Sequence, residues 1–104
     1  DDSARVLENI VFIELLRRHF TPYYFSNSRE CDFIAVKDET AEAIQVTYQI
    51  EEGNRERELK GVSEAVKSTR TGKGYILTYN EEEDLEVEGV EIKVIPVWKW
   101  LLGL

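Results

Sequence analysis

The sequence predicts an α/β fold in which helices flank a mixed β-sheet. Apolar residues recur at helical spacing in two long segments, residues 3–19 and 54–69, and short segments rich in β-branched and aromatic residues lie between and after them. Short turns join the three early extended segments, so these can pair antiparallel. The second helix can cross over to a parallel strand. The expected element order is α-β-β-β-α-β-β-α.

The first helix is expected over residues 3–19 because of its broad apolar face. The apolar residues at helical spacing are Val6, Leu7, Ile10, Val11, Ile13, Leu15 and Leu16. Ser3 can cap the amino end, and basic residues near the carboxyl end complement the helix dipole. The helix is expected to end before Pro22, which cannot continue it.

Three strands are expected next, at residues 23–25, 31–36 and 42–48, with polar turns between them. Side chains alternate between the two faces of a strand. In the second strand, alternation gives one face of Cys31, Phe33 and Ala35 and another of Asp32, Ile34 and Val36. In the third strand, it gives one face of Ile44, Val46 and Tyr48 and another of Ala43, Gln45 and Thr47.

A second long helix is expected from about residue 54 to residue 69, with Asn54 as a possible cap. Gly61 lies in its interior, where glycine weakens a helix by roughly 1 kcal/mol relative to alanine. Its presence there indicates that another segment packs closely against the helix.

The rest of the chain predicts two strands and a short helix. The strands are expected at residues 74–78 and 90–94, and Pro96 opens the helix. The acidic stretch at 80–84 is expected to be a solvated loop.

Composition limits both the size and the class of the protein. The 104 residues, 42% of them hydrophobic, fit one domain over residues 1–104. Nothing approaches the ~18 consecutive apolar residues that span a bilayer, and the single Cys31 cannot form an internal disulfide, so a cytoplasmic location is expected. The net charge of -8 argues against a dedicated nucleic-acid surface but leaves room for a local basic patch.

Asp32, Gln45 and Thr47 follow the layout of a metal-dependent nuclease site. Such a site places an acid on one strand, then a second acid and a lysine two residues apart on the next strand. The acids hold Mg²⁺, which polarises the scissile phosphate, and the lysine orients the attacking water. In this chain Gln45 occupies the second acidic position and Thr47 the lysine position, while Glu8 is a candidate extra acid. The alternative is that these are ordinary solvated polar residues.

Five segments carry a resemblance to a known family. They are LENIVFIELLRR at residues 7–18, ECDFI at 30–34, AIQVTY at 43–48, RERE at 55–58 and IPVWKWLL at 95–102. Taken in this order, they resemble the uncharacterised domain found C-terminal to archaeal-type P-loop ATPases. The resemblance covers essentially the whole chain.

Members of that family resemble PD-(D/E)XK nucleases, that is, restriction-endonuclease-like folds fused behind an ATPase module. The resemblance implies that Glu8, Asp32, Gln45 and Thr47 occupy the site positions. The chain departs from an active pattern at Gln45 and Thr47. No Walker-type G-x-x-x-x-G-K-[ST] motif occurs, so any ATPase module is expected upstream, with this chain as a C-terminal fragment.

Cations on the second helix are candidates to replace the positive charge of the missing lysine, but not its action on water. Arg55, Arg57 and Lys60 lie near its start, and an arginine can grip phosphate with two donors without activating water. These three are the candidate nucleic-acid-binding residues. The alternative is a solvated helix face whose charges pair with each other.

Three functions follow, and the leading one is a catalytically degenerate nuclease-like C-terminal domain that serves nucleic-acid binding or regulation, with DNA and the upstream ATPase as partners. The second is an active Mg²⁺-dependent nuclease, in which Asp32 and Gln45 would hold the metal; whether the segment is an enzyme stays open. The third is a protein-interaction module. The acidic surface favours it, as does the end of the chain, where Trp98 and Trp100 can close the core, bind a partner or stack on bases.

Overall fold

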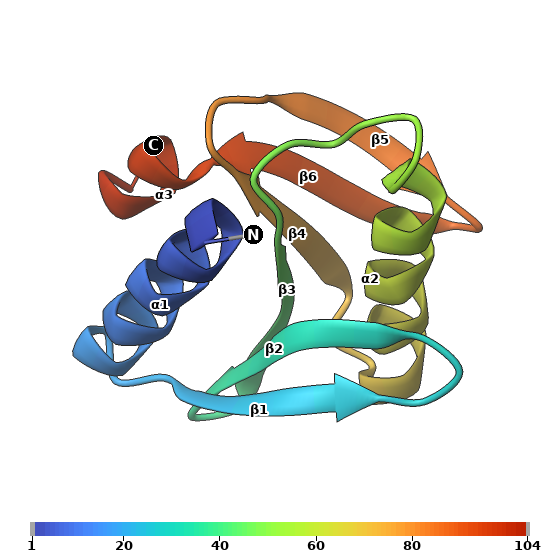
Figure 1. The fold of residues 1–104 in the computed structure, drawn as a ribbon. Helices are drawn as coiled ribbons and strands as arrows, with labels where there is room; N and C mark the ends of the chain where they lie inside the picture. Colours follow the sequence, from blue (N-terminus) through green and yellow to red (C-terminus); the bar gives the residue numbers. More distant parts are fainter. Residues whose placement is uncertain (1, 104) are drawn as a thin grey trace.

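The computed structural model describes residues 2–103 and shows a six-stranded sheet with helices on both faces (Figure 1). The elements are α1 (Asp2–Arg17), β1 (Thr21–Ser26), β2 (Glu30–Lys37), β3 (Thr40–Val46), α2 (Arg55–Thr69), β4 (Lys73–Thr78), β5 (Glu83–Val87), β6 (Val90–Pro96) and α3 (Val97–Leu101). The strand order is β1-β2-β3-β4-β6-β5. β1, β2 and β3 pair antiparallel, β3, β4 and β6 run parallel, and β5 returns antiparallel to β6. The predicted mixed sheet with flanking helices is confirmed.

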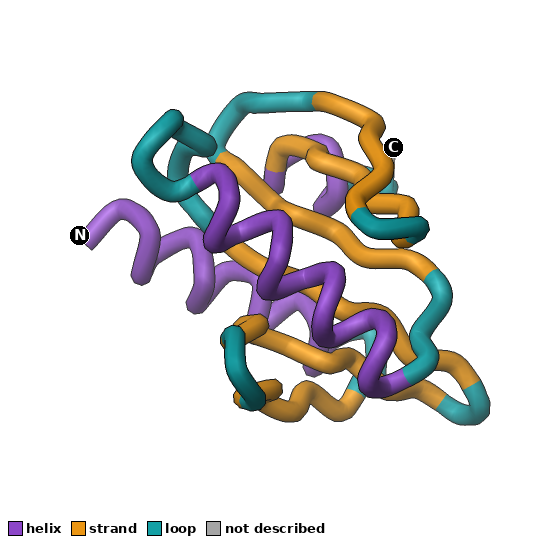
Figure 2. The backbone as a smooth tube through the Cα atoms, turned by 90° about the vertical axis from the view of Figure 1, so that its right-hand side faces the viewer, coloured by secondary structure: helices purple, strands orange, loops and turns teal. Residues whose placement is uncertain are grey.

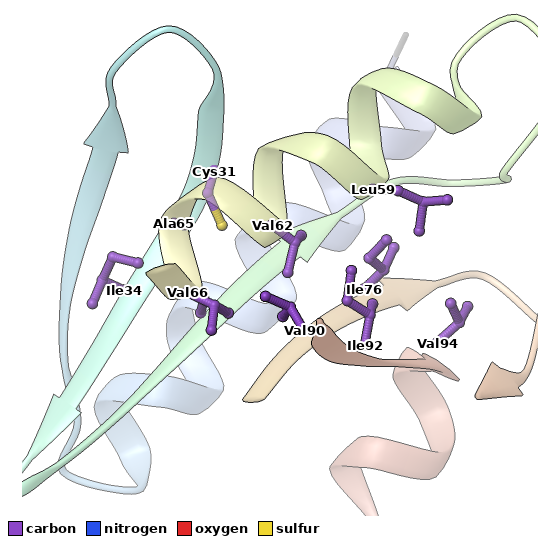
Figure 3. Close-up of a cluster of buried hydrophobic side chains, with 11 residues drawn as sticks. Cys31, Ile34, Leu59, Val62, Ala65, Val66, Ile76, Val90, Ile92 and Val94 are labelled. Atoms are coloured by element: carbon purple, nitrogen blue, oxygen red, sulfur yellow. The ribbon is translucent and has the colours of Figure 1, made fainter. Parts of the chain in front are cut away.

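Two apolar cores lie on opposite faces of this sheet. Figure 2 shows α2 in front of the strands and α1 behind them. The core under α2 contains Leu59, Val62, Ala65 and Val66 of the helix and Ile76, Ile92 and Val94 of the sheet (Figure 3). The core under α1 and α3 contains Leu7, Val11, Leu15 and Val97 with Ile44, Leu77 and Ile95. Each fully buried side chain of this kind contributes roughly 1.5–3 kcal/mol to the stability of the fold.

The predicted element order was wrong in one place, because it lacked β5. The acidic stretch 80–84, expected to be a loop, runs into this strand at Glu83. Leu85 and Val87 pack against the core under α2, and the acidic residues between and before them face solvent. β5 is an edge strand, and edge strands are commonly rich in charge, which prevents pairing with other chains. Because acidic residues surround Leu85 and Val87, their alternation was not recognised as the pattern of a strand.

The interior glycine of α2 lies against the backbone of β2. A Cβ atom at Gly61 would collide with the carbonyl oxygen of Glu30. The close packing that the sequence predicts at this position is confirmed. It holds the start of β2 directly against the helix.

α1 buries less of its apolar face than its sequence suggests. Leu7, Val11 and Leu15 are buried, whereas Val6 is 55% and Ile13 62% exposed.

Within residues 2–103, no helix has the length and apolarity needed to cross a membrane.

Candidate functional site

A β-bulge in β2 creates the candidate site. Between β1 and β2 the register shifts, so that Asp32 and Phe33 together face the single residue Tyr24. The bulge places Cys31 in the core of Ile34, under α2, whereas Phe33 lies in the other core. The prediction that Cys31 shares a face with Phe33 was therefore wrong, because strict alternation does not hold across a bulge.

Asp32 and Gln45 close the gap that opens between β2 and β3 beside the bulge. The regular pairing of the two strands extends only to Phe33 and Ile44. Beyond it, the Asp32 N–H donates to the Gln45 Oε1 at 2.8 Å, and the Val46 N–H donates to the Asp32 Oδ2 at 2.9 Å. Two side chains thus replace the backbone partners that a regular ladder would supply.

Glu58 of α2 completes the network and is a site residue that the sequence prediction missed. It is only 5% exposed, and its carboxylate accepts a hydrogen bond from the Gln45 Nε2. The Nη2 of Arg57 lies 3.9 Å from its Oε1. A signal was present in the sequence, since Glu58 lies four residues before Val62 and therefore on the buried face of the helix. The alternating charges around it suggested a solvated segment instead.

A hollow of about 540 Å³ opens beside this network. Its lining combines carboxylates, guanidinium groups and small polar residues from the β1–β2 turn, β2, β3 and both long helices. The lining residues are Glu8, Ser26, Asn27, Ser28, Arg29, Glu30, Asp32, Gln45, Val46, Arg57 and Glu58. Glu8, Asp32 and Gln45, predicted as site residues, therefore share one hollow.

The hollow is electrostatically unfavourable for an ionised Asp32. The pKa of the Asp32 carboxyl is raised from 3.8 to about 6, chiefly by burial and in smaller part by the negative charges of Glu8, Glu58 and Glu30. The hydrogen bond from the Val46 N–H acts in the opposite direction and lowers the pKa. The carboxylates therefore repel one another, and a cationic group entering the hollow would relieve this repulsion.

Thr47, at the predicted lysine position, lies outside the hollow lining. β3 ends at Val46, so Thr47 follows the strand instead of belonging to it. It is 8% exposed, its N–H donates to the Leu77 carbonyl, and its hydroxyl donates to the Gln49 carbonyl at 3.5 Å. A lysine in place of Thr47 would therefore occupy a buried position.

The three predicted phosphate-binding cations face different surroundings. Arg55 pairs with Glu83 of β5 at 3.1 Å, and Lys60 pairs with Glu56 at 3.3 Å. Arg57, whose side chain is 70% exposed, is the one of the three that lines the hollow of Asp32. Arg29, from the turn between β1 and β2, joins it there.

No preformed metal site is visible in the part of the chain that the structure describes. Within residues 2–103, no three Asp, Glu, His or Cys side chains converge as ligands of one ion. Asp32 and Gln45 are the predicted metal ligands, and each already uses an oxygen to accept a backbone N–H. Gln45 would have to give up its bond to the Asp32 N–H before its oxygen could bind a metal.

Comparison with known proteins connects the chain to an uncharacterised family. A family model described as a domain of unknown function (DUF4143) matches residues 4–100. The uncharacterised protein MJ1544 of Methanocaldococcus jannaschii is 38% identical over 97% of this chain, and an uncharacterised protein of Haemophilus influenzae is 40% identical over 95% of it. The chain spans only 25% and 23% of the lengths of these two relatives. No solved structure matches significantly. The family match covers nearly the whole chain, and the chain therefore belongs to the DUF4143 family.

Proposed function

We propose that this chain is a nuclease-like module that has lost hydrolytic chemistry and that serves nucleic-acid binding or regulation within a larger P-loop ATPase. The order α1-β1-β2-β3-α2-β4 supports a PD-(D/E)XK-like core. So does the placement of Asp32 on one strand and Gln45 on the next, facing one hollow. The two relatives are about four times as long as this chain, which supports a multidomain context.

The proposed loss of hydrolytic chemistry rests on the hydrogen bonds that Asp32 and Gln45 already make within the fold. Asp32 and Gln45 satisfy strand N–H groups, and Gln45 also donates to Glu58. A hydrolytic site needs oxygens free to hold a metal and an amine to orient water. In this hollow the groups at the acidic positions hold the fold together instead, and the lysine position is a buried threonine.

The cations of the hollow support binding without cleavage. Among its described lining residues, Arg29 and Arg57 carry positive charge. Arginine stays protonated at any working pH and pairs with phosphate through two donors, but it does not readily accept a proton from water. These two residues are therefore suited to hold a phosphodiester backbone at the rim of an otherwise acidic site.

DNA binding measured at several salt concentrations tests this proposal. We expect weak binding whose affinity falls as the salt concentration rises. In the double variant Arg29→Ala with Arg57→Ala, the slope of log affinity against log salt should be shallower, by the equivalent of roughly two phosphate contacts. Arg5→Ala is the matched control, because Arg5 is exposed on α1 and does not line the hollow. Equal effects of the double variant and of the Arg5 control would contradict the proposed phosphate site.

An active Mg²⁺-dependent nuclease is the second candidate, and Glu58 is the observation that favours it. This residue brings a buried carboxylate to Gln45, beside Asp32, and so adds negative charge where the acidic position of β3 lacks it. Incubation with plasmid DNA and Mg²⁺ or Mn²⁺ separates the two candidates. Cleavage that disappears in Asp32→Ala would establish the nuclease. Intact DNA is expected for the module without chemistry.

A further inference from the structure

Three neighbouring strands each end beside an exposed aromatic residue. Tyr48 follows β3, Tyr79 follows β4 and Trp98 follows β6, each within two residues of the strand end. They are 36%, 57% and 50% exposed. β3, β4 and β6 are parallel, so their carboxyl ends lie at the same edge of the sheet, where the two loops and α3 gather (Figure 1). We refer to Tyr48, Tyr79 and Trp98 as the aromatic edge.

Direct contacts hold these rings in place. The rings of Tyr48 and Tyr79 stack with centroids 4.9 Å apart and planes 17° from parallel. The Tyr79 N–H donates to the Tyr48 carbonyl at 3.0 Å, which continues the β3–β4 pairing beyond the strands. The Trp98 Nε1–H donates to the Asn80 Oδ1 at 3.1 Å. The side chain that follows Tyr79 in the chain therefore fixes the orientation of Trp98.

Further bonds tie together the segments that carry the rings. The Ile50 N–H donates to the Glu81 carboxylate at 2.7 Å and links the loop after β3 to the loop after β4. The Lys99 Nζ donates to the Glu82 carboxylate at 2.6 Å and links the second loop to α3. A surface that is ordered before binding loses less conformational entropy when a partner arrives.

The charge of these loops is negative. Glu51 and Glu52 lie in the loop of Tyr48, and Glu81 and Glu82 lie in the loop of Tyr79. The amine contributed by α3, Lys99, is already paired with Glu82. Within residues 2–103, Glu51 and Glu52 form no side-chain ion pair. Aromatic faces surrounded by carboxylates repel a phosphate backbone and attract a cation.

We propose that the aromatic edge is a docking surface for an arginine-bearing segment of a partner protein. A guanidinium group is planar and weakly hydrated, so it stacks on Tyr and Trp rings, and the ring quadrupole attracts its charge. The nearby carboxylates add attraction over a longer range. Tyrosine and tryptophan are also the residues most often found at the energetic centre of protein interfaces. The proposal rests on this edge alone and does not depend on the hollow of Asp32.

Calorimetric titration of the chain with a short arginine-rich synthetic peptide tests the proposal. We expect binding that weakens roughly two- to tenfold in Tyr79→Ala and in Trp98→Ala. Tyr79→Phe keeps the ring and should retain most of the affinity. The matched control is Tyr23→Ala, because Tyr23 is also 57% exposed but lies on β1, at the far side of the sheet. Circular dichroism verifies that each variant folds.

Three comparisons separate the proposal from general attraction between opposite charges. The same peptide with citrulline in place of arginine should lose binding, and the lysine version should bind more weakly than the arginine version. The double variant Glu51→Gln with Glu52→Gln should weaken binding more than Glu86→Gln with Glu91→Gln, which removes equal charge from the β5–β6 pair. Asp32→Asn should leave peptide binding unchanged.

Several outcomes of these titrations would contradict the proposal. The proposal is overturned if the arginine peptide does not bind, if the citrulline version binds as well, or if Tyr79→Ala weakens binding no more than Tyr23→Ala. Preferential binding of a single-stranded oligothymidylate, lost in Tyr79→Ala, would instead assign the aromatic edge to nucleic-acid bases.

Discussion

The Asp32 carboxylate accepts a hydrogen bond that holds the sheet together, yet its negative charge is destabilised by its surroundings. Its carboxylate accepts the Val46 N–H where the strands part, which favours the ionised form. Its burial, together with the negative charges of Glu8 and Glu58, favours the neutral form. The pKa of Asp32, raised to about 6, shows that burial and repulsion outweigh the hydrogen bond. The ionised side chain is therefore less stable in the folded protein than in the unfolded one.

The raised pKa gives the stability of the protein a defined pH dependence. Between pH 4 and pH 6 the folded state binds more protons at Asp32 than the unfolded state does, so the contribution of this group to stability falls as pH rises through that window. Asp32→Asn removes the titration while keeping the shape and an oxygen for the Val46 N–H. We expect this variant to gain stability relative to the native chain at pH 7, by on the order of 2 kcal/mol, and to match it near pH 4.

Urea unfolding of both proteins across this pH range measures the effect. Taking the difference between them cancels the titration of all other groups. A variant that is less stable than the native chain at pH 7 would show that the Val46 hydrogen bond outweighs burial, contrary to the direction of the pKa shift.

α2 is the element that joins the core to the candidate site. One side of it fills the core with Leu59, Val62 and Val66, and the same side delivers Glu58 to Gln45. Its position depends on Gly61, where the helix touches the backbone of β2 next to the bulge. A displacement of α2 would therefore disturb the site as well as the packing.

Gly61→Ala tests this dependence. Alanine favours a helix over glycine by roughly 1 kcal/mol, so propensity alone predicts a gain in stability. The added Cβ would collide with the Glu30 carbonyl, which belongs to the backbone and cannot rotate away. We expect a net loss of about 1–3 kcal/mol, as is usual for overpacked positions.

Gly53→Ala is the control for this substitution, because a Cβ at Gly53 would meet nothing within 4 Å. It should be neutral or slightly stabilising. Chemical denaturation of the two variants gives both values, and equal stabilities would mean that α2 can shift away from β2 at little cost.

At the scale of the whole molecule, the sequence predicts what depends on local pattern and misses what depends on neighbours. The helical spacing of apolar residues was enough to predict α1 and α2, and Asp32 and Gln45, selected from their positions on adjacent predicted strands, line one hollow. The face of Cys31 was not predictable, because the bulge breaks alternation without a sequence mark. Glu58 and β5 were missed for a shared reason, since charged residues usually indicate solvent exposure whatever side of an element they occupy.

The net charge of -8 makes one further test possible for the molecule as a whole. Repulsion among surface carboxylates destabilises the compact state, and salt screens that repulsion, so NaCl should raise the stability of the chain. For a module without metal chemistry, MgCl₂ at equal ionic strength should raise it by about as much. A cation held in the hollow of Asp32 would add stabilisation by binding the folded state alone, and this addition should disappear in Asp32→Asn.

Thermal unfolding in the two salts measures the difference. Equal increments in the native chain support the loss of hydrolytic chemistry, whereas a Mg²⁺ surplus abolished by Asp32→Asn would favour the active nuclease.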